Sequence, residues 1–283
     1  MNFLPSIELI RDAELRGYAV PSFCAWNAEA MKTILDVAEE LRAPVIVMNG
    51  WAEFPIIRPK IISSYAWALI KHYTIPAALH LDHGQSIEEV VECIEANYTS
   101  VMLDFSTRPF KDNVSALRAV VEIAHPRGVT VEGELGAVGR AEGKTAEGTI
   151  QSSLTEPEEA REYVEETGVD ILAVSIGNAH GIYRELPRLD FDRLKKIHDV
   201  SGIPLVLHGG SGTPQVDLKR AISLGIAKVN VASELVHTVR NSLMEQWQAG
   251  KNLWISLACE PAYRLMADVV RNWFYMTDSA GKA

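Results

Sequence analysis

The sequence is poor in cysteine and in positive charge. Among 283 residues there are three cysteines, Cys24, Cys93 and Cys259, and no two of them form a C-x-x-C pair. The odd count and the spacing favour free or buried thiols in a reducing compartment, so we expect a cytoplasmic protein. Lys and Arg number 27 against 37 Asp and Glu, a net charge of −10. This balance argues against a nucleic-acid or membrane-surface binder, since both need a basic face.

Long apolar runs and linkers are also missing. No stretch of 18 apolar residues occurs, so no membrane-spanning helix is expected. The first residues, MNFLPSIELIRDAELRG, lack a basic start and a long apolar core, and no signal peptide is expected. No low-complexity segment divides the chain. We therefore expect one domain over residues 1–283, with residues 233–283 as a C-terminal helical extension.

Eight short β-branched or apolar runs alternate with stretches of helical period. The expected strands are residues 18–23, 44–48, 77–82, 100–105, 130–135, 170–176, 204–209 and 227–231. Eight units of about 35 residues predict an α/β fold, a parallel (β/α)8 TIM barrel. A doubly wound open sheet is the alternative. The barrel is favoured because eight units fill the chain and no G-x-G-x-x-G motif follows a strand.

Three histidines fall at the ends of expected strands, where barrel enzymes place reacting groups. They are His83, His180 and His208, after the third, sixth and seventh strands. Three neutral imidazoles with an open fourth position are typical of catalytic zinc. The alternative is that each is an ordinary rim histidine with a hydrogen-bond partner. His80 shares a strand face with Asp82 and is expected to lie in a barrel layer rather than to bind metal.

Acidic side chains surround the same rim. They are Asp82, Asp104, Glu132 and Glu134, and the last two share one face of a strand. One of that pair is expected to face the site and the other to lie deeper. The alternative is that these carboxylates bind backbone or lysine groups.

Two further segments suggest substrate contacts. The glycine-rich turn at residues 209–212 follows the seventh strand, and residues 230–233 follow the eighth, which is where barrels usually bind phosphate. The segment 136–148 has four glycines and is expected to be a mobile loop or lid. Glu142 lies in its middle, and simple solvation of this side chain is the alternative to a catalytic role.

These residues resemble the class II, metal-dependent ketose-bisphosphate aldolases, and most closely the tagatose- and fructose-bisphosphate branch. The resemblance runs from residue 17 to about residue 235. It rests on the segments LHLDH at 79–83, VEGELG at 131–136, AHG at 179–181, LHGGSG at 207–212 and KVNV at 228–231. It implies a (β/α)8 barrel, a catalytic Zn²⁺ ion and dihydroxyacetone phosphate as the shared three-carbon substrate or product.

The resemblance also implies roles for single residues. His83, His180 and His208 would be the zinc ligands, Asp82 the acid serving the hydroxyl at the aldol bond, and Glu142 the lid glutamate that shuttles the carbon-bound proton. Asp104 and Glu134 match positions that can hold a second or displaced metal ion. The dihydroxyacetone phosphate site would comprise Gly181, Gly209, Gly210, Ser211, Asn230, Val231, Ala232 and Ser233. A monovalent cation, Na⁺ or K⁺, and a homodimer or homotetramer are further expectations.

Departures from the family pattern gather on the acceptor-aldehyde side. Cys24 replaces the usual Asn, Gly50 a Ser or Thr, and Phe105 a Gly. Ala262 stands where the family has an arginine that can reach a distal phosphate, and Arg264 is out of register with it.

The expected function is therefore cleavage or formation of a ketose phosphate, a small-molecule sugar phosphate, to give dihydroxyacetone phosphate and an aldehyde. The alternatives are the same reaction on a ketose 1-phosphate or other non-bisphosphate, and a metal-dependent sugar-phosphate isomerase or epimerase. A binding protein that has lost catalysis is a further possibility, against which Asp82 and Glu142 argue, since binding needs no proton-transfer groups.

Overall fold

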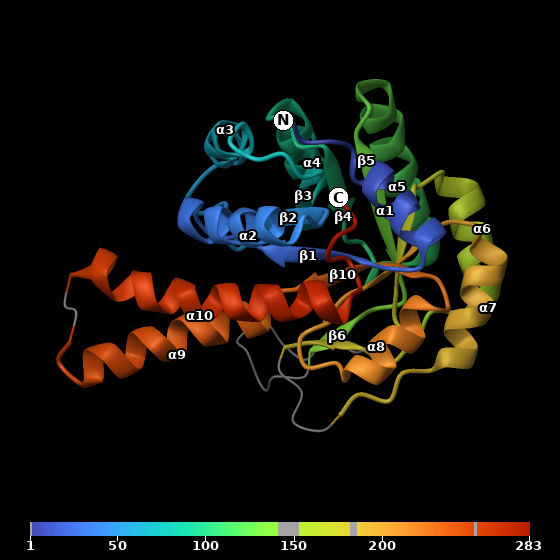
Figure 1. Cartoon of the computed structure of the whole chain (residues 1–283). Coiled ribbons are helices and arrows are strands. Elements are labelled where there is room, and N and C mark those ends of the chain that lie inside the picture. Colours follow the sequence, from blue (N-terminus) through green and yellow to red (C-terminus); the bar gives the residue numbers. More distant parts are fainter. Residues whose placement is uncertain (1, 141–152, 182–185, 252–253) are drawn as a thin grey trace.

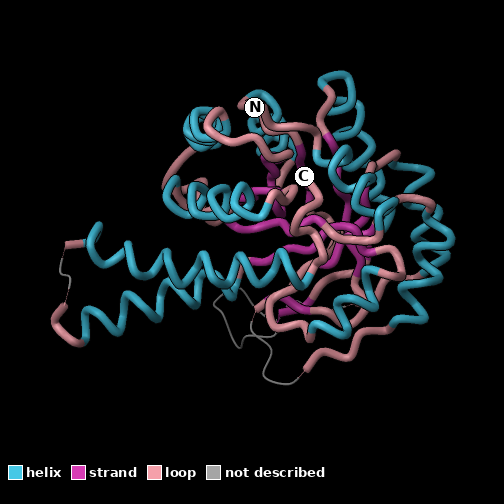
Figure 2. The backbone as a smooth tube through the Cα atoms, viewed as in Figure 1, coloured by secondary structure: helices cyan, strands magenta, loops and turns pink. Residues whose placement is uncertain are grey.

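A computed structural model describes residues 2–140, 153–181, 186–251 and 254–283. Eight parallel strands close into a barrel in the order β1-β10-β9-β7-β5-β4-β3-β2. The prediction of a (β/α)8 barrel is thus confirmed, and the open sheet is excluded (Figures 1 and 2). The barrel strands are β1 (Val20–Cys24), β2 (Val45–Gly50), β3 (Ala77–Gly84), β4 (Ser100–Leu103), β5 (Thr130–Leu135), β7 (Ile171–Val174), β9 (Leu205–Leu207) and β10 (Ile226–Val231).

Helices surround the barrel, and at least two of them begin at a side chain that caps the helix N-terminus. Asn27 accepts a hydrogen bond from Ala30 N at the start of α2, and Ser86 accepts one from Glu89 N at the start of α4. The outer helices are α2 (Ala28–Leu41), α3 (Pro59–Ile70), α4 (Ile87–Glu95), α5 (Phe110–Ala124) with the short 3₁₀ helix η1 (His125–Arg127), α6 (Pro157–Thr167), α7 (Phe191–Ser201) and α8 (Gln215–Ile222).

Helix α1 (Ser6–Arg16) packs against the inward-facing side chains of the barrel. Its apolar residues Leu9, Ile10 and Ala13 are buried with inward side chains from several strands, among them Ile46 and Val206. The first turn of α1 reaches the starts of β4 and β5, since Ser6 Oγ donates to Ser100 Oγ and Ile7 N donates to Thr130 Oγ1. The N-terminal end of the barrel is therefore filled by protein, which leaves the opposite end for chemistry.

Two long helices form an arm at the C-terminal end of the chain. Helices α9 (Ser233–Gln248) and α10 (Ile255–Met276) pack against each other and extend well beyond the barrel (Figure 1). α10 also packs on α2. Among the described helices, none combines the length and the hydrophobicity that crossing a membrane requires.

Candidate active site

Three imidazoles meet at the C-terminal end of the barrel. His83 lies near the end of β3, His180 ends β8 (Ala179–His180) and His208 directly follows β9. His83 Nε2 is 3.1 Å from His180 Nε2 and 2.9 Å from His208 Nδ1. A tetrahedral zinc ion with Zn–N bonds of about 2.0–2.1 Å separates its ligands by about 3.3 Å. The three nitrogen atoms therefore fit one metal ion.

The backbone of β3 turns His83 toward this centre. The pairing of β3 with β4 shifts register between Leu81 and Gly84, an irregularity that re-aims the intervening side chains. His83 itself has a φ of 49°, in the left-handed region that non-glycine residues rarely adopt. Such conformations cost free energy and gather at functional sites.

Carboxylates orient two of the imidazoles. Asp104 follows β4, and its Oδ2 lies 2.8 Å from His83 Nδ1, so the Nδ1–H donates to Asp104 and leaves Nε2 as a lone-pair donor. On the other side, His208 Nε2 lies 2.8 Å from Glu132 Oε1, which leaves Nδ1 facing the centre. Carboxylates that hold the distal nitrogen are a regular feature of metal-bound histidines. The donor set and its partners thus suit a metal.

The electrostatic environment favours a positive charge at this point. Burial acts to lower the pKa of His83, but the carboxylates of Asp82 and Asp104 outweigh it and raise that pKa to about 10. Burial and the neighbouring His83 hold the pKa of His208 well below its ordinary value. A position that stabilises a proton on His83 against burial also stabilises a metal cation in its place.

Glu134 lies close to this centre. Its Oε1 accepts a hydrogen bond from Val138 N, whereas Oε2 is buried and has no hydrogen-bond partner among the described residues. Burial and the charge of Asp104 raise the pKa of Glu134 to about 8. Ligand atoms of His83, Asp104 and Glu134 lie within 4.8 Å of one another. The structure thus brings together the residues expected to hold a second metal ion.

Asp82 points toward the same end of the barrel from β3. Its Oδ1 accepts a hydrogen bond of 2.8 Å from Asn230 Nδ2 on β10. Asn230 is almost fully buried, and its Oδ1 has no hydrogen-bond partner among the described residues. The Asn230 amide therefore links the Asp82 carboxylate to the neighbourhood of His208, whose Nε2 lies 3.3 Å from Asn230 Nδ2.

The two expected phosphate-binding segments lie side by side. Gly210 N donates to Asn230 O, and Glu234 N in the first turn of α9 donates to Ser211 Oγ. Gly209 has a φ of 63°, and a Cβ there would lie 2.1 Å from Ala179 O, so only glycine fits beside β8. Gly181 directly follows β8, while Val231, Ala232 and Ser233 lead from β10 into α9. Glu142 lies outside the described residues.

A cavity of about 90 Å³ adjoins Asp82. Its described lining holds two carboxylates and no Lys or Arg: Cys24, Met48, Asn49, Gly50, Trp51, Ala52, Glu53 and Asp82. A Cβ on Gly50 would lie 2.2 Å from the backbone oxygen of Asp82, so β2 and β3 approach too closely here for a larger residue. Burial and the charge of Asp82 raise the pKa of Glu53.

The chain itself supplies no arginine to this cavity from α10. Ala262 is fully buried in the packing of α10, and the exposed Arg264 forms an ion pair with Glu260 one turn away. Arg264 is not among the residues that line this cavity in the described part of one chain.

Sequence reasoning missed two residues. Lys228 on β10 is fully buried, and its Nζ donates to Glu132 Oε2 at 2.7 Å. The period of two along β10 places it on the same face as Asn230, and that signal could have identified it. Glu53 lies in the loop after β2, where its Oε2 accepts from Gly50 N. No periodic signal marks it.

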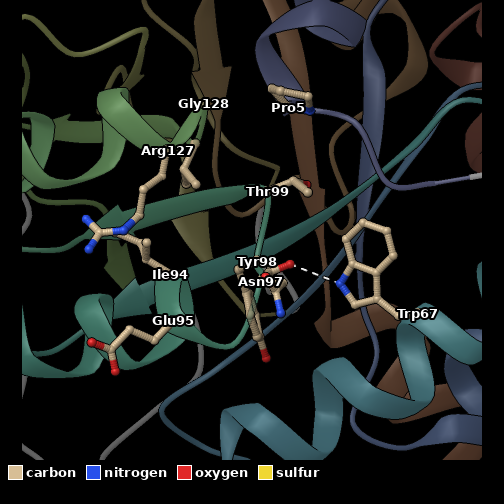
Figure 3. A pocket seen from close by; sticks show the side chains of 10 residues that line it. Pro5, Trp67, Ile94, Glu95, Asn97, Tyr98, Thr99, Arg127 and Gly128 are labelled. Atoms are coloured by element: carbon tan, nitrogen blue, oxygen red, sulfur yellow. Dashed lines mark hydrogen bonds between the residues drawn. The ribbon is translucent and has the colours of Figure 1, made fainter.

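The larger described cavity, about 630 Å³, lies at the other end of the barrel (Figure 3). Thr99 and Val129, which directly precede β4 and β5, line it together with Trp67 and Arg127. The Trp67 indole donates to Asn97 O. This is the end of the barrel where residues serve stability rather than catalysis, so the size of the cavity does not identify it as the active site.

Comparison with known proteins agrees with this geometry. The family model for class II fructose-bisphosphate aldolase matches residues 5–282. The YdjI aldolase from Escherichia coli K12 is 33% identical, with a TM-score of 0.88 and 99% of each chain covered. A candidate fructose-1,6-biphosphate aldolase from Coccidioides immitis is 28% identical, with a TM-score of 0.86, covering 98% of this chain and 97% of that one.

A more distant structure shares the fold. The fructose-bisphosphate aldolase from Campylobacter jejuni is 21% identical, with a TM-score of 0.83, covering 100% of this chain and 97% of that one. The resemblance inferred from the motifs is confirmed by the family match, which spans nearly the whole chain. The protein is an aldolase, a carbon–carbon lyase, and it belongs to the class II fructose-bisphosphate aldolase family.

Proposed function

We propose that this aldolase is metal-dependent and cleaves or forms a ketose phosphate, with dihydroxyacetone phosphate and an aldehyde as the other partners. The observation that carries the proposal is the convergence of three imidazole nitrogen atoms. His83 Nε2 lies 3.1 Å from His180 Nε2 and 2.9 Å from His208 Nδ1. Zn²⁺ is the ion that this all-imidazole set suits best. Asp104 and Glu134 offer carboxylate oxygens for a second or displaced ion.

The bound ion would supply Lewis acidity for the negative charge that develops on the substrate oxygens when the bond beside the carbonyl breaks. Asp82 then serves as the group that removes the proton from the hydroxyl of the departing aldehyde. The Asn230 amide holds the Asp82 carboxylate in place. Lys228 is unsuited to a Schiff base, because its ammonium is buried against Glu132.

The phosphate of dihydroxyacetone phosphate would bind between residues 209–211 and residues 230–233, with Gly181 beside them. Helix α9 begins at this point, and helix N-termini favour anions through their free N–H groups and dipole. A monovalent cation, Na⁺ or K⁺, is proposed close to this phosphate. Glu142 is proposed to exchange the proton on carbon.

The acceptor side favours a substrate without a distal phosphate. The cavity beside Asp82 contains Glu53 and Asp82, and both are of the wrong sign for a phosphate. Arginine, the residue best suited to binding a phosphate, is absent from its described lining. A ketose 1-phosphate is therefore the second candidate substrate.

The arm of α9 and α10 provides a surface for self-association. It exposes large apolar side chains, among them Met244, Trp254, Ile255, Leu257 and Leu265. Exposed apolar patches of this kind mark protein–protein contacts. We propose a cytoplasmic homodimer or homotetramer that uses this arm.

One assay tests the main proposal. Purified protein loaded with Zn²⁺ is given a panel of ketose bisphosphates and ketose 1-phosphates, and dihydroxyacetone phosphate is measured with a coupled reductase. Product from at least one member is expected. Conversion of a substrate without release of dihydroxyacetone phosphate would favour the isomerase or epimerase, and tight binding without turnover would favour a binding protein.

A further inference from the structure

A buried ion pair lies directly beneath the three histidines. Lys228 on β10 and Glu132 on β5 extend from well-separated strands of the barrel into its interior. Lys228 Nζ donates to Glu132 Oε2 at 2.7 Å, and both side chains have no exposed surface. The other carboxylate oxygen, Glu132 Oε1, lies 2.8 Å from His208 Nε2. A lysine, a glutamate and a proposed metal ligand therefore form one continuous chain of contacts.

Stability alone does not account for this pair. Lys228 pairs in the sheet with Val20 on β1 and Val206 on β9, so its strand neighbours are apolar. Replacing a buried ion pair by apolar residues of similar volume is often neutral or stabilising. A charged pair buried inside the barrel thus calls for a role other than stability.

The hydrogen on His208 is assigned by the same contacts. Asn230 Nδ2 also lies near His208 Nε2, at 3.3 Å, and one of its two hydrogens is donated to Asp82. The shorter contact is to Glu132, and an ionised carboxylate can only accept. The hydrogen is therefore on Nε2, and the lone pair of His208 is on Nδ1, which faces His83.

His80 does not replace Lys228 in this arrangement. Its Nε2 is 3.6 Å from Glu132 Oε2, beyond hydrogen-bond range. Its other nitrogen, Nδ1, is bonded to Ser100 Oγ at 2.7 Å. Among the described residues, the cation that is hydrogen-bonded to Glu132 is therefore Lys228.

We propose that Lys228 is a positioning residue for the metal centre: it fixes the Glu132 carboxylate, which in turn holds His208 in the tautomer and orientation that present Nδ1 to the metal ion. This inference rests on the proposed metal role of His83, His180 and His208. Lys228 acts through Glu132, the residue to which its Nζ is hydrogen-bonded. Partners of this kind typically change metal affinity by 10- to 100-fold when mutated.

Zinc affinity measured by chelator competition on folded protein tests the proposal in a double-mutant cycle. We expect Glu132→Gln to weaken zinc binding by about 10- to 100-fold and Lys228→Met by about 10-fold or more. In the Glu132→Gln background, Lys228→Met should add little, because its route to His208 is already broken. Ser22→Ala is the control: Ser22 is equally buried on the neighbouring β1 and should leave zinc affinity unchanged.

Several results would overturn the proposal. A zinc affinity of Lys228→Met within twofold of wild type would do so. So would an equal loss of zinc affinity when Lys228→Met is made in wild type and in Glu132→Gln, because that would indicate a packing effect. If Lys228→Met does not fold, nitrogen NMR of histidine in the zinc-loaded wild type decides. Coordination of His208 through Nδ1 is expected, and coordination through Nε2 contradicts the proposal.

The test of Lys228 and the assay of the proposed aldolase reaction can fail independently. A wild-type protein that binds zinc through the three histidines but releases no dihydroxyacetone phosphate would refute the proposed reaction and leave the role of Lys228 standing. A wild-type protein that does not bind zinc there would refute both.

Discussion

Asn230 and Asp82 are joined across the barrel mouth by a hydrogen bond of 2.8 Å, from the side-chain amide of one to Oδ1 of the other. The bond engages Oδ1 and fixes the carboxylate next to His83. Two substitutions separate the contributions of this pair.

Asp82→Asn should reduce carbon–carbon cleavage by roughly 10²- to 10⁴-fold, the usual contribution of a general acid or base. Asn230→Ala should cost about 10- to 100-fold, because it removes one hydrogen bond to a charged group. Steady-state kcat/KM measures both, and zinc content serves as the control for an intact metal site. Cleavage by Asp82→Asn within a few-fold of wild type would remove Asp82 from the proton-transfer role.

Chelation should abolish turnover, and Zn²⁺ should restore it, because three histidine nitrogen atoms converge on one point. His208→Ala should lose bound zinc while remaining folded, as measured by elemental analysis and circular dichroism. His72→Ala is the matched control, since His72 is exposed next to α3 and away from the site. A full equivalent of zinc retained by His208→Ala would contradict the assignment.

The cavity of about 90 Å³ beside Asp82, here called the acceptor cavity, predicts that a distal phosphate on the substrate does not improve kcat/KM. We expect fructose 1,6-bisphosphate to be a poorer substrate than fructose 1-phosphate in kcat/KM, because the described lining has two carboxylates and no Lys or Arg. Glu53→Gln should raise kcat/KM for the bisphosphate by roughly 3- to 10-fold, the effect of removing one partly screened like charge. The value for the 1-phosphate should stay nearly constant. A preference for the bisphosphate in wild type would show that a group outside this lining grips the phosphate.

The arm predicts how the chain assembles. Trp254 is 70% exposed at the start of α10, so Trp254→Glu should weaken an assembly that buries this surface. Sedimentation velocity at several protein concentrations measures the mass of the assembly in wild type and in the variant. Leu15→Glu is the comparison variant, because Leu15 on α1 is 86% exposed and lies outside the arm. An unchanged assembly in Trp254→Glu would place the interface elsewhere.

Acid stability should depend on Glu39 in α2. Its carboxylate accepts from Thr74 N at 2.7 Å, Thr74 Oγ1 at 2.6 Å and Ile75 N at 3.2 Å. Burial acts to raise the pKa of Glu39, but these hydrogen bonds outweigh it and lower that pKa below 4.5. The stabilisation is thus complete above the unfolded-state pKa and is lost as the pH falls through the folded-state pKa.

The matching experiment compares thermal unfolding of wild type and Glu39→Gln between pH 7 and pH 3. Wild type should be the more stable at pH 7, and the difference in Tm should shrink as the carboxylate takes up a proton. A difference that stays constant across this range would show that the hydrogen bonds do not depend on ionisation.

Much of the barrel could be predicted because its strands are short apolar runs with helical stretches between them. The eight expected strands coincide with the eight barrel strands to within a few residues. The strand-end rule also placed His83, His180 and His208 on one rim, since parallel strands share a direction. What the pattern could not give was the irregular part: the register shift in β3, the short strand pair β6 (Gly139–Arg140) and β8, and the left-handed backbone of His83.

Residues that act from the barrel interior were harder to recognise. Lys228 was visible in the sequence, but a lysine within an apolar run gives no sign of its partner on β5, about a hundred residues away. Glu53 lies in a loop whose path depends on its own hydrogen bond to Gly50 N. Such contacts arise from the closure of the barrel and from loop geometry, neither of which is encoded in local periodicity.

The close approach of Gly50 to Asp82 bears on how acceptor preference can change over evolutionary time or in the laboratory. A Cβ at residue 50 would lie 2.2 Å from a backbone oxygen, and backbone gives way far less readily than the end of a side chain. A Ser at this position therefore cannot be introduced alone; β2 and β3 would first have to separate. A route that places a side chain at residue 50 must therefore begin with substitutions elsewhere in β2 or β3, and the order of these steps is constrained before selection on activity can act.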